Sequence, residues 1–186
     1  MLLIEDSRQQ IYAGDKHKNI HDYCERKGIR IVRQPLSYGD YALCDENAFD
    51  PLAKVDRDGN YQGRYEPDMT ITVDTKASIM ELISNVMSRD HRRLRDECLR
   101  AQEAGSTLIF LVEEMPPCGR IDMWEPPVHR HPSKYHRAGE PMTRADPKLF
   151  RKCLITMQEK YGCKFRFCDG RQTGKQLFEY LTGVRT

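Results

Sequence analysis

The stretch TITVDTK, residues 70–76, alternates apolar and polar side chains in the way that is typical of a β-strand. Side chains two positions apart share a face of a strand, so Thr72, Asp74 and Lys76 are expected to project together. The other face is expected to enter the core through Ile71, Val73 and Thr75. An acid beside a lysine at the end of such a strand is either a surface ion pair or part of a catalytic site.

A second acidic position comes earlier in the chain, where Gly39 and Asp40 precede the apolar run YALC. Glycine and aspartate favour turns, so this pair alone indicates only a turn. Together, however, Asp40 and Asp74 could supply carboxylates from two neighbouring strands to a hard cation such as Mg²⁺. A lysine beside them could orient or deprotonate water and offset charge on a phosphate in the transition state. The combination therefore predicts metal-dependent phosphodiester chemistry.

Working outward from these strands, the hydrophobic pattern predicts an α/β fold whose mixed β-sheet is flanked by helices. Helices are expected over 16–27, 78–87, 90–104, 146–161 and 172–182, with Gly28, Gly162 and Gly183 as stops. Strands are expected over 2–6, 30–36, 38–44, 70–76, 106–114 and 164–168. The second and third of these strands follow each other closely and are expected to form a hairpin-like pair.

We expect a single domain, residues 1–186, with three parts. Residues 2–114 carry the motifs, 115–145 form a long basic loop, and 146–186 form a C-terminal helix, strand and helix. The polar segment 45–67 is expected to be a hairpin excursion or a loop.

The composition favours a globular protein, because 39% of the residues are hydrophobic and 31% are charged. No stretch approaches the roughly 20 apolar residues that span a bilayer, and the start does not resemble a signal peptide. We therefore do not expect a membrane protein, and we expect a cytoplasmic location.

Seven cysteines, an odd number, argue against a disulfide framework. Cys163 and Cys168 flank a predicted strand at an odd offset, so their side chains should point to opposite faces and share no metal. A zinc site remains possible for one cluster of ligand types: Cys118, His129, His131 and His136.

The formal net charge is only +2, so the total does not predict a nucleic-acid partner. Two segments, 89–100 and 115–145, are nevertheless rich in basic side chains. Each could be a solvated face or a phosphate-binding surface. Trp124 and Tyr135 could stack on unpaired bases, or Trp124 could simply anchor its loop to the domain.

The order of these motifs resembles the PD-(D/E)XK nuclease superfamily and, within it, the XPF-type nuclease domain of excision-repair and branched-DNA endonucleases. Gly39-Asp40 and Asp74-Thr75-Lys76 carry the main resemblance. Further matches, in the family's order, are Asp6-Ser7-Arg8 after LLIE, the helix start KASIMEL, Arg93-Leu94, and IFLVEE with Glu113. The tail looks like small stand-alone bacterial or phage versions, and the resemblance implies a restriction-endonuclease-like core.

The resemblance implies a role for each matching residue. Asp40, Asp74 and Lys76 would be catalytic, and Mg²⁺ or Mn²⁺ would be held at Asp6, Asp40, Asp74 and Thr75. Arg8, Arg92 and Arg93 would contact DNA, as their forked side chains suit phosphate, and the basic loop would add Trp124 and Arg130. Glu97, one turn after Arg93, would lie near the metal or pair with Arg93. The implied partners are DNA, branched or containing junctions, and a second copy of the chain.

Three departures from the family pattern bear on the substrate. Thr75 replaces the family's middle arginine, and Asp74 is one methylene shorter than the usual glutamate. The segment between Asp40 and Asp74 is longer than the family's short hairpin. No tandem helix-hairpin-helix module is recognisable. Selection of branched structures in repair, recombination or phage DNA processing is thus an expectation from resemblance alone.

Two other functions remain open at this point. A non-catalytic DNA-binding or scaffolding module would have no reason to keep the Asp, Asp and Lys set. A restriction-type enzyme that cleaves plain duplex DNA at specific sequences would use the same core.

Overall fold

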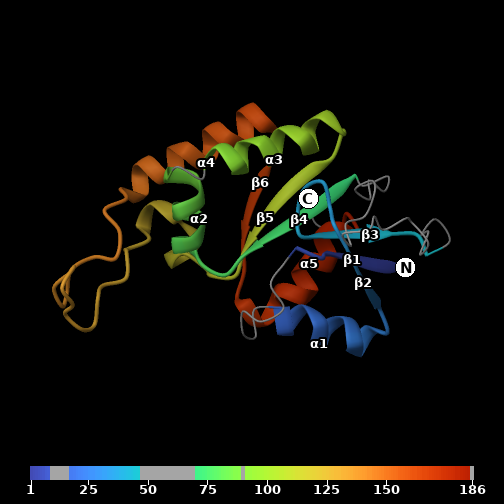
Figure 1. Ribbon diagram of the computed structural model, residues 1–186, viewed down its shortest axis with the longest axis horizontal. Helices are drawn as coiled ribbons and strands as arrows, with labels where there is room; N and C mark the ends of the chain where they lie inside the picture. The colour runs from blue at the N-terminus through green and yellow to red at the C-terminus, as the bar shows by residue number, and fades with distance from the viewer. Residues whose placement is uncertain (9–16, 47–69, 89–90, 185–186) are drawn as a thin grey trace, which may run out of the picture.

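The computed structural model describes residues 1–8, 17–46, 70–88 and 91–184 (Figure 1). The strands are β1 (Leu2–Asp6), β2 (Arg30–Gln34), β3 (Tyr41–Cys44), β4 (Ile71–Lys76), β5 (Thr107–Val112) and β6 (Lys164–Phe167). The helices are α1 (Lys18–Lys27), α2 (Ile79–Met87), α3 (His91–Glu103), α4 (Pro147–Tyr161) and α5 (Thr173–Leu181). Short 3₁₀ turns are η2 (Pro117–Gly119), η3 (Ile121–Met123) and η4 (Gly170–Gln172). Most of the predicted 45–67 segment lies outside the described residues.

The strands form one mixed sheet in the order β2-β1-β3-β4-β5-β6. β3 runs antiparallel to both its neighbours, β1 and β4, whereas the β1–β2, β4–β5 and β5–β6 pairs are parallel. The predicted mixed α/β sheet is therefore confirmed. The expected hairpin-like pairing of the second and third strands is wrong, because β1 lies between them. β1 is buried along its whole length, which suits an inner position, while the charged RIVRQ of β2 occupies an edge.

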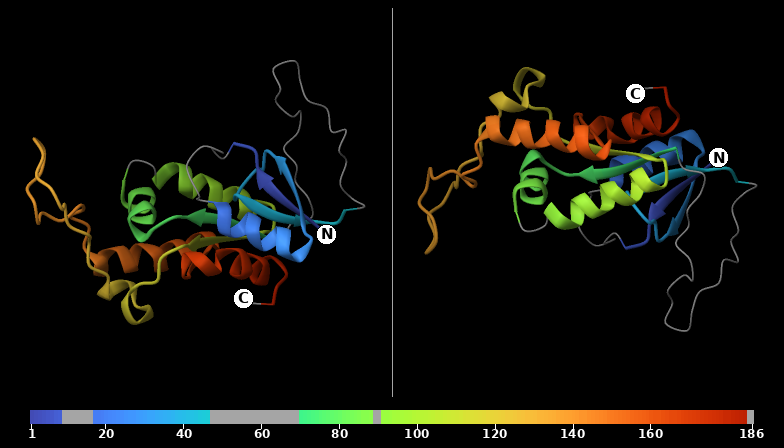
Figure 2. Two further views of the ribbon diagram at one scale, coloured as in Figure 1. Left: turned by 90° about the horizontal axis from the view of Figure 1, so that it is seen from below. Right: turned by 90° about the horizontal axis from the view of Figure 1, so that it is seen from above.

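Helices cover both faces of the sheet (Figures 1 and 2). α2, α3 and α4 pack on one face, over a core that includes Leu2, Ile4, Phe110 and Phe150. α1 and α5 pack together on the other face, over a second core that includes Leu3, Tyr41, Val73 and Leu177. Cys163 belongs to the first core and Cys168 to the second, which confirms that they point to opposite faces.

The helix ends follow the sequence signals. Gly28 ends α1 and Gly162 ends α4, both in the left-handed conformation that glycine adopts without strain. Ser78 caps α2 by accepting a hydrogen bond from the backbone N–H of Glu81. No helix among the described residues is long and apolar enough to cross a membrane.

The predicted basic loop contains η2, η3 and then an irregular hairpin, which we define as residues 125–145. Its two arms are joined by a bridge between Val128 and Pro141 and by a hydrogen bond from His129 N to Glu140 O, 2.9 Å long. The hairpin projects away from the body of the molecule (Figure 2). The segment is therefore a structured projection with no strand of the main sheet in it.

Candidate active site

Three strand ends meet at one edge of the sheet and bring the predicted residues together. β1 ends at Asp6, β4 ends at Lys76, and β3, which runs the other way, begins just after Asp40. Backbone hydrogen bonds join these ends directly: Asp6 N donates to Asp40 O, and Asp40 N donates to Val73 O, each 2.8 Å long. The mixed strand directions thus place residues that are far apart in the sequence side by side.

Asp74 and Lys76 project from the same face of β4 and are both buried, with 4% and 5% of their surface exposed. Lys76 Nζ donates to Asp74 Oδ1 and lies 5.8 Å from the centroid of the Phe110 ring. The two side chains do form an ion pair, but the interpretation of a surface pair is wrong. A buried pair costs desolvation, so it is weak evidence for a stabilising role.

Asp40 lies where β3 and β4 separate. Its Oδ2 accepts a hydrogen bond from Thr75 N at 2.8 Å and one from Thr75 Oγ1 at 3.0 Å. The carboxylate therefore satisfies a backbone N–H of β4 beyond the last residue pair of the two strands. Gly39 precedes it with φ of +71°, and a Cβ there would lie 3.0 Å from the Thr72 Cβ. Glycine is thus required for the turn that presents Asp40.

Glu97 reaches this site from α3, where its Oε1 accepts a hydrogen bond from Gly39 N at 2.8 Å. Of the two predicted positions, the structure favours the one beside the carboxylates, since no ion pair with Arg93 occurs among the described residues. Sequence reasoning missed Arg100, whose Nε donates to Ser37 O at 2.9 Å and fixes α3 to the turn before Asp40. Its spacing of three from Glu97 on a helix was the available signal.

Arg8 binds Asp6 through two nitrogens, with Nη2 2.6 Å from Oδ2 and Nε 3.0 Å from Oδ1. This hydrogen bonding raises the pKa of Arg8, and the charges of Glu97 and Asp40 raise it further. Arg8 therefore lies close to the carboxylates while about half of its side chain, 54%, stays exposed. The Asp6 carboxylate is thus paired with Arg8 in this structure, and its role as a metal ligand stays a prediction.

Burial and neighbouring charges shift the pKa values of the side chains in the site. Burial raises the pKa of Asp74 well above its usual value, and the charges of Asp40 and Glu97 add to this while Lys76 opposes it. Burial also raises the pKa of Glu97, again with a contribution from Asp40. For Lys76, burial disfavours the charged form, but Asp74, Asp40 and Glu97 together outweigh it and raise the pKa. The charged form of Lys76 is therefore favoured, and Arg8 and Arg100 add positive charge near the same carboxyl groups.

This donor set fits a hard divalent cation. Carboxylate oxygens are the ligands that Mg²⁺ and Mn²⁺ prefer, and a cation would offset the burial and the nearby negative charge that raise the two carboxyl pKa values. With the side chains as they stand, no three His, Cys, Asp or Glu residues of the described ranges are close enough together to hold an ion. In the predicted zinc cluster, the rings of His129 and His136 stack with their centroids 3.4 Å apart instead of converging on one point, which goes against zinc there.

The predicted DNA contacts lie in different settings. Arg92 and Arg93 are exposed on the first turn of α3, and Arg130 is exposed on the hairpin. Trp124, by contrast, is only 4% exposed, and its Nε1 donates to Glu114 Oε1 at 3.0 Å. Of its two interpretations, anchoring of the loop is therefore the one that the structure supports, and stacking on bases is corrected. The ring is buried because it belongs to the core on the α2, α3 and α4 face of the sheet.

Comparison with known proteins places the chain in a family. A family model described as the ERCC4 domain matches residues 6–181. The chain belongs to the ERCC4 domain family. Members of the ERCC4 family are endonucleases of the XPF type, so the resemblance to that nuclease domain inferred from the motifs is confirmed.

The fold of this ERCC4 domain also has a solved counterpart. XPF from Aeropyrum pernix matches with a TM-score of 0.54 and 16% identity, over 97% of this chain. The match covers 64% of the Aeropyrum pernix chain, so the present chain spans less than two thirds of that protein. At this identity the likeness supports the fold alone, which agrees with the predicted restriction-endonuclease-like α/β core. No curated protein sequence matches the chain.

Proposed function

We propose that this chain is a Mg²⁺- or Mn²⁺-dependent endonuclease that hydrolyses DNA at branches, flaps or junctions, in DNA repair, recombination or phage DNA processing. The observation that carries the proposal is the grouping of the partly exposed Asp40 with the buried Asp74 and Lys76 at one edge of the sheet, in a family of endonucleases. Burial raises the pKa values of Asp74 and Glu97 around Lys76, and the charge of Asp40 adds to the rise. An arrangement so costly to folding is typical of a functional site.

Each residue has a distinct role in the proposed reaction. Asp40 and Asp74 would hold the cation, with Glu97 beside them and Thr75 fixing the position of the Asp40 carboxylate. When bound, the cation would lower the pKa of water and neutralise charge on the phosphate. Lys76 would orient the attacking water and donate to the phosphate as negative charge develops on it. Arg8, Arg92 and Arg93 would bind the flanking phosphates, while Asp6 would orient Arg8.

The first prediction tests these roles. Asp40→Asn and Lys76→Met should each lower the cleavage rate at least about a hundredfold, because each removes a charge that acts on the reacting phosphate. DNA binding should stay close to that of the wild-type protein, because the exposed arginines remain. The measurement is cleavage of linear, flap, splayed and four-way DNA with Mg²⁺ or Mn²⁺. Lys160→Gln, an exposed change at the far end of α4, is the matched control.

Retained cleavage in both folded variants would reject the assignment. The two alternatives have their own signatures in the same set of measurements. A scaffolding module would show no heat of binding when it is titrated with Mg²⁺ or Mn²⁺. A restriction-type enzyme would cut the plain duplex into fragments with uniform ends. By the same family resemblance we propose that the active form is a homodimer, which sedimentation of the purified protein would reveal. We also propose that it acts in the cytoplasm, which fractionation of cells that express it would test.

A further inference from the structure

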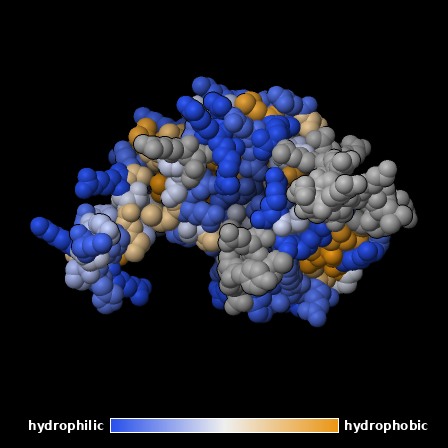
Figure 3. Space-filling model, viewed as in Figure 1, coloured by the Kyte–Doolittle hydropathy of each residue, from blue (hydrophilic) through white to orange (hydrophobic). Residues whose placement is uncertain are grey.

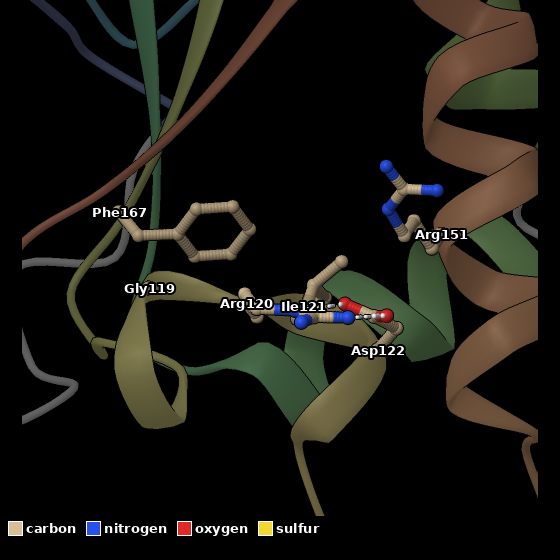
Figure 4. A pocket seen from close by; sticks show the side chains of 6 residues that line it. All are labelled: Gly119, Arg120, Ile121, Asp122, Arg151 and Phe167. Atoms are coloured by element: carbon tan, nitrogen blue, oxygen red, sulfur yellow. Dashed lines mark hydrogen bonds and ion pairs between the residues drawn. The ribbon is translucent and has the colours of Figure 1, made fainter.

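A hollow separate from the carboxylate site lies between the 3₁₀ turns η2 and η3, the helix α4 and the end of β6 (Figure 4). Its volume is about 350 Å³, within the range of small-ligand sites. The Phe167 ring borders one side and the Arg151 guanidinium faces it from α4 (Figure 4). Arg120, Ile121 and Asp122 form the wall between them.

The sheet register connects this hollow to the catalytic edge. Lys76 of β4 is paired with Val112 of β5, and Val112 is paired with Phe167 of β6. Phe167 therefore lies two strand spacings from Lys76, or about 10 Å along the sheet. Phe167 packs against the same core as Phe110, over whose ring Lys76 lies, so both project from the same face. A DNA strand that crosses the carboxyl ends of β4, β5 and β6 would reach both places.

The side chains around the hollow divide into a fixed pair and an available cation. Arg120 Nη2 binds Asp122 Oδ2 at 2.8 Å. The hydrogen bond from Arg120 lowers the pKa of Asp122, and the nearby charge of Arg151 lowers it further. Arg151 forms no ion pair with any residue that the structure describes. The charge of Arg151 therefore acts on Asp122 without an ion pair between them, and its guanidinium can donate hydrogen bonds to a ligand.

An aromatic ring opposite an arginine is the combination that binds unpaired nucleotides. The ring stacks on the face of a base, and the guanidinium binds the adjoining phosphate. Bases inside a duplex are stacked on their neighbours and could not lie against a ring set into a hollow. The largely buried Ile121 makes part of the lining apolar. The chemistry therefore selects a single-stranded nucleotide over duplex DNA.

We propose that this hollow binds one unpaired nucleotide of the substrate strand close to the cleaved bond, with its base on Phe167 and its phosphate on Arg151. The inference rests on the proposed nuclease function and adds a binding subsite to it. This subsite would explain the proposed preference for flaps and splayed ends, because such DNAs contain unpaired nucleotides. The residues responsible would then be Phe167 and Arg151 and not the metal-binding carboxylates.

The test measures binding without divalent metal, so that it does not depend on cleavage. Two DNAs share one duplex, and one of them carries a single-stranded arm with 2-aminopurine, a fluorescent adenine analogue, next to the junction. Phe167→Leu keeps the apolar packing but removes the ring, and Arg151→Gln removes the charge. Each should weaken binding of the armed DNA by about tenfold and leave the blunt duplex unchanged. Lys152→Gln, the neighbouring exposed position on α4, is the matched control.

Stacking gives a second readout. The wild-type protein should quench the 2-aminopurine fluorescence, and Phe167→Leu should abolish the quenching in a protein with an unchanged melting temperature. Equal effects of the variants on armed and blunt DNA, or quenching that survives in Phe167→Leu, would overturn the subsite. Wild-type cleavage of the same DNAs with Mg²⁺ is scored separately. Cleavage with unaltered binding by the variants rejects the subsite alone, whereas no cleavage by the wild type rejects the proposed function.

Discussion

Two threonines on β4 have the same side chain and opposite surroundings. Thr75 donates its hydroxyl to Asp40, whereas the hydroxyl of Thr72, which is fully buried, has no hydrogen-bond partner among the described residues. A buried hydroxyl without a partner costs free energy, while one that binds a carboxylate stabilises the fold. Substitutions at Thr75 and Thr72 should therefore change the stability of the protein in opposite directions, and only those at Thr75 should affect the site.

Thr75→Val should lower the free energy of unfolding by about 1.5 kcal/mol, because the carboxylate loses a charged hydrogen bond. If that bond positions Asp40 for catalysis, the cleavage rate should fall by about tenfold. Thr75→Ser, which keeps the hydroxyl, should restore both. Urea unfolding and initial cleavage rates are the two measurements. A Thr75→Val protein with wild-type cleavage would show that the bond does not orient the Asp40 carboxylate.

Thr72→Val should have the reverse effect on stability and none on the rate. Valine matches threonine in shape and replaces an unpartnered hydroxyl by a methyl group, so unfolding should require about 1 kcal/mol more. The same urea titration serves. A destabilised Thr72→Val protein would contradict this reading of the hydroxyl's surroundings.

At the residue scale, strand periodicity was enough to place Asp74 beside Lys76 on one face. It could not show that the pair is buried, since burial depends on the helices that pack over this face of the sheet. The interpretation of Trp124 also stayed open for this reason. A tryptophan in a proline-rich segment is equally compatible with a binding surface and an anchor. The burial of its ring and its hydrogen bond to Glu114, just after β5, separate the two.

Among the elements, α1 and α5 pack tightly against each other, and Gly174 permits this close approach. A Cβ at Gly174 would lie 2.5 Å from the Tyr23 Cβ and 2.6 Å from Asn19 O. The second of these atoms belongs to the backbone, so α1 as a whole would have to move. Small residues at such a crossing let two helices approach more closely than larger side chains allow.

Gly174→Ala should therefore lower the free energy of unfolding by about 3 kcal/mol, at the upper end of overpacking effects. Its neighbour Lys175→Ala, which changes only an exposed side chain, should stay within about 0.5 kcal/mol of wild type. Chemical denaturation followed by circular dichroism gives both values. A Gly174→Ala protein as stable as the Lys175→Ala protein would contradict the close crossing.

Helices and strands with a clear period were predictable, and so were the glycine stops at Gly28 and Gly162. Which strands are neighbours in the sheet was harder to predict. β2 and β3 are adjacent in the sequence, which favoured a hairpin, but pairing is decided by which strand can be buried on both faces. LLIED meets that condition, and RIVRQ, with arginine at two of its five positions, does not.

For the whole molecule, the distribution of charge matters more than its total. The face over α3 and α4 is predominantly hydrophilic, and the hairpin stands clear of it (Figure 3). The tip of the hairpin is open to solvent, with Tyr135 81% exposed and Lys134 4.7 Å from its ring centroid. Such a projection contributes few side chains to the core, and it extends the surface that is available to a partner.

Replacing residues 128–141 by a Gly-Ser linker should leave the melting temperature unchanged. The flanking residues already meet, with Met142 N 2.8 Å from Pro127 O. If the hairpin holds DNA, affinity should fall, and the dependence of affinity on salt should weaken by about two to three units of slope, because Arg130, Lys134 and Arg137 are removed. Arg26→Gln with Lys27→Gln, on the opposite face, is the charge control. An unchanged slope would exclude the hairpin from the DNA interface.

The contact between α1 and α5 has a consequence for how the polypeptide is made. The core on that side of the sheet needs Leu177, Phe178 and Leu181 from α5 to cover Leu3 and Val73, which were synthesised far earlier. Until α5 leaves the ribosome, only α1 covers this face of the sheet. The apolar surface that α5 would cover is exposed and promotes aggregation. A chain truncated before Thr173 would accordingly be lost to misfolding, although every carboxylate of the site is still encoded in it.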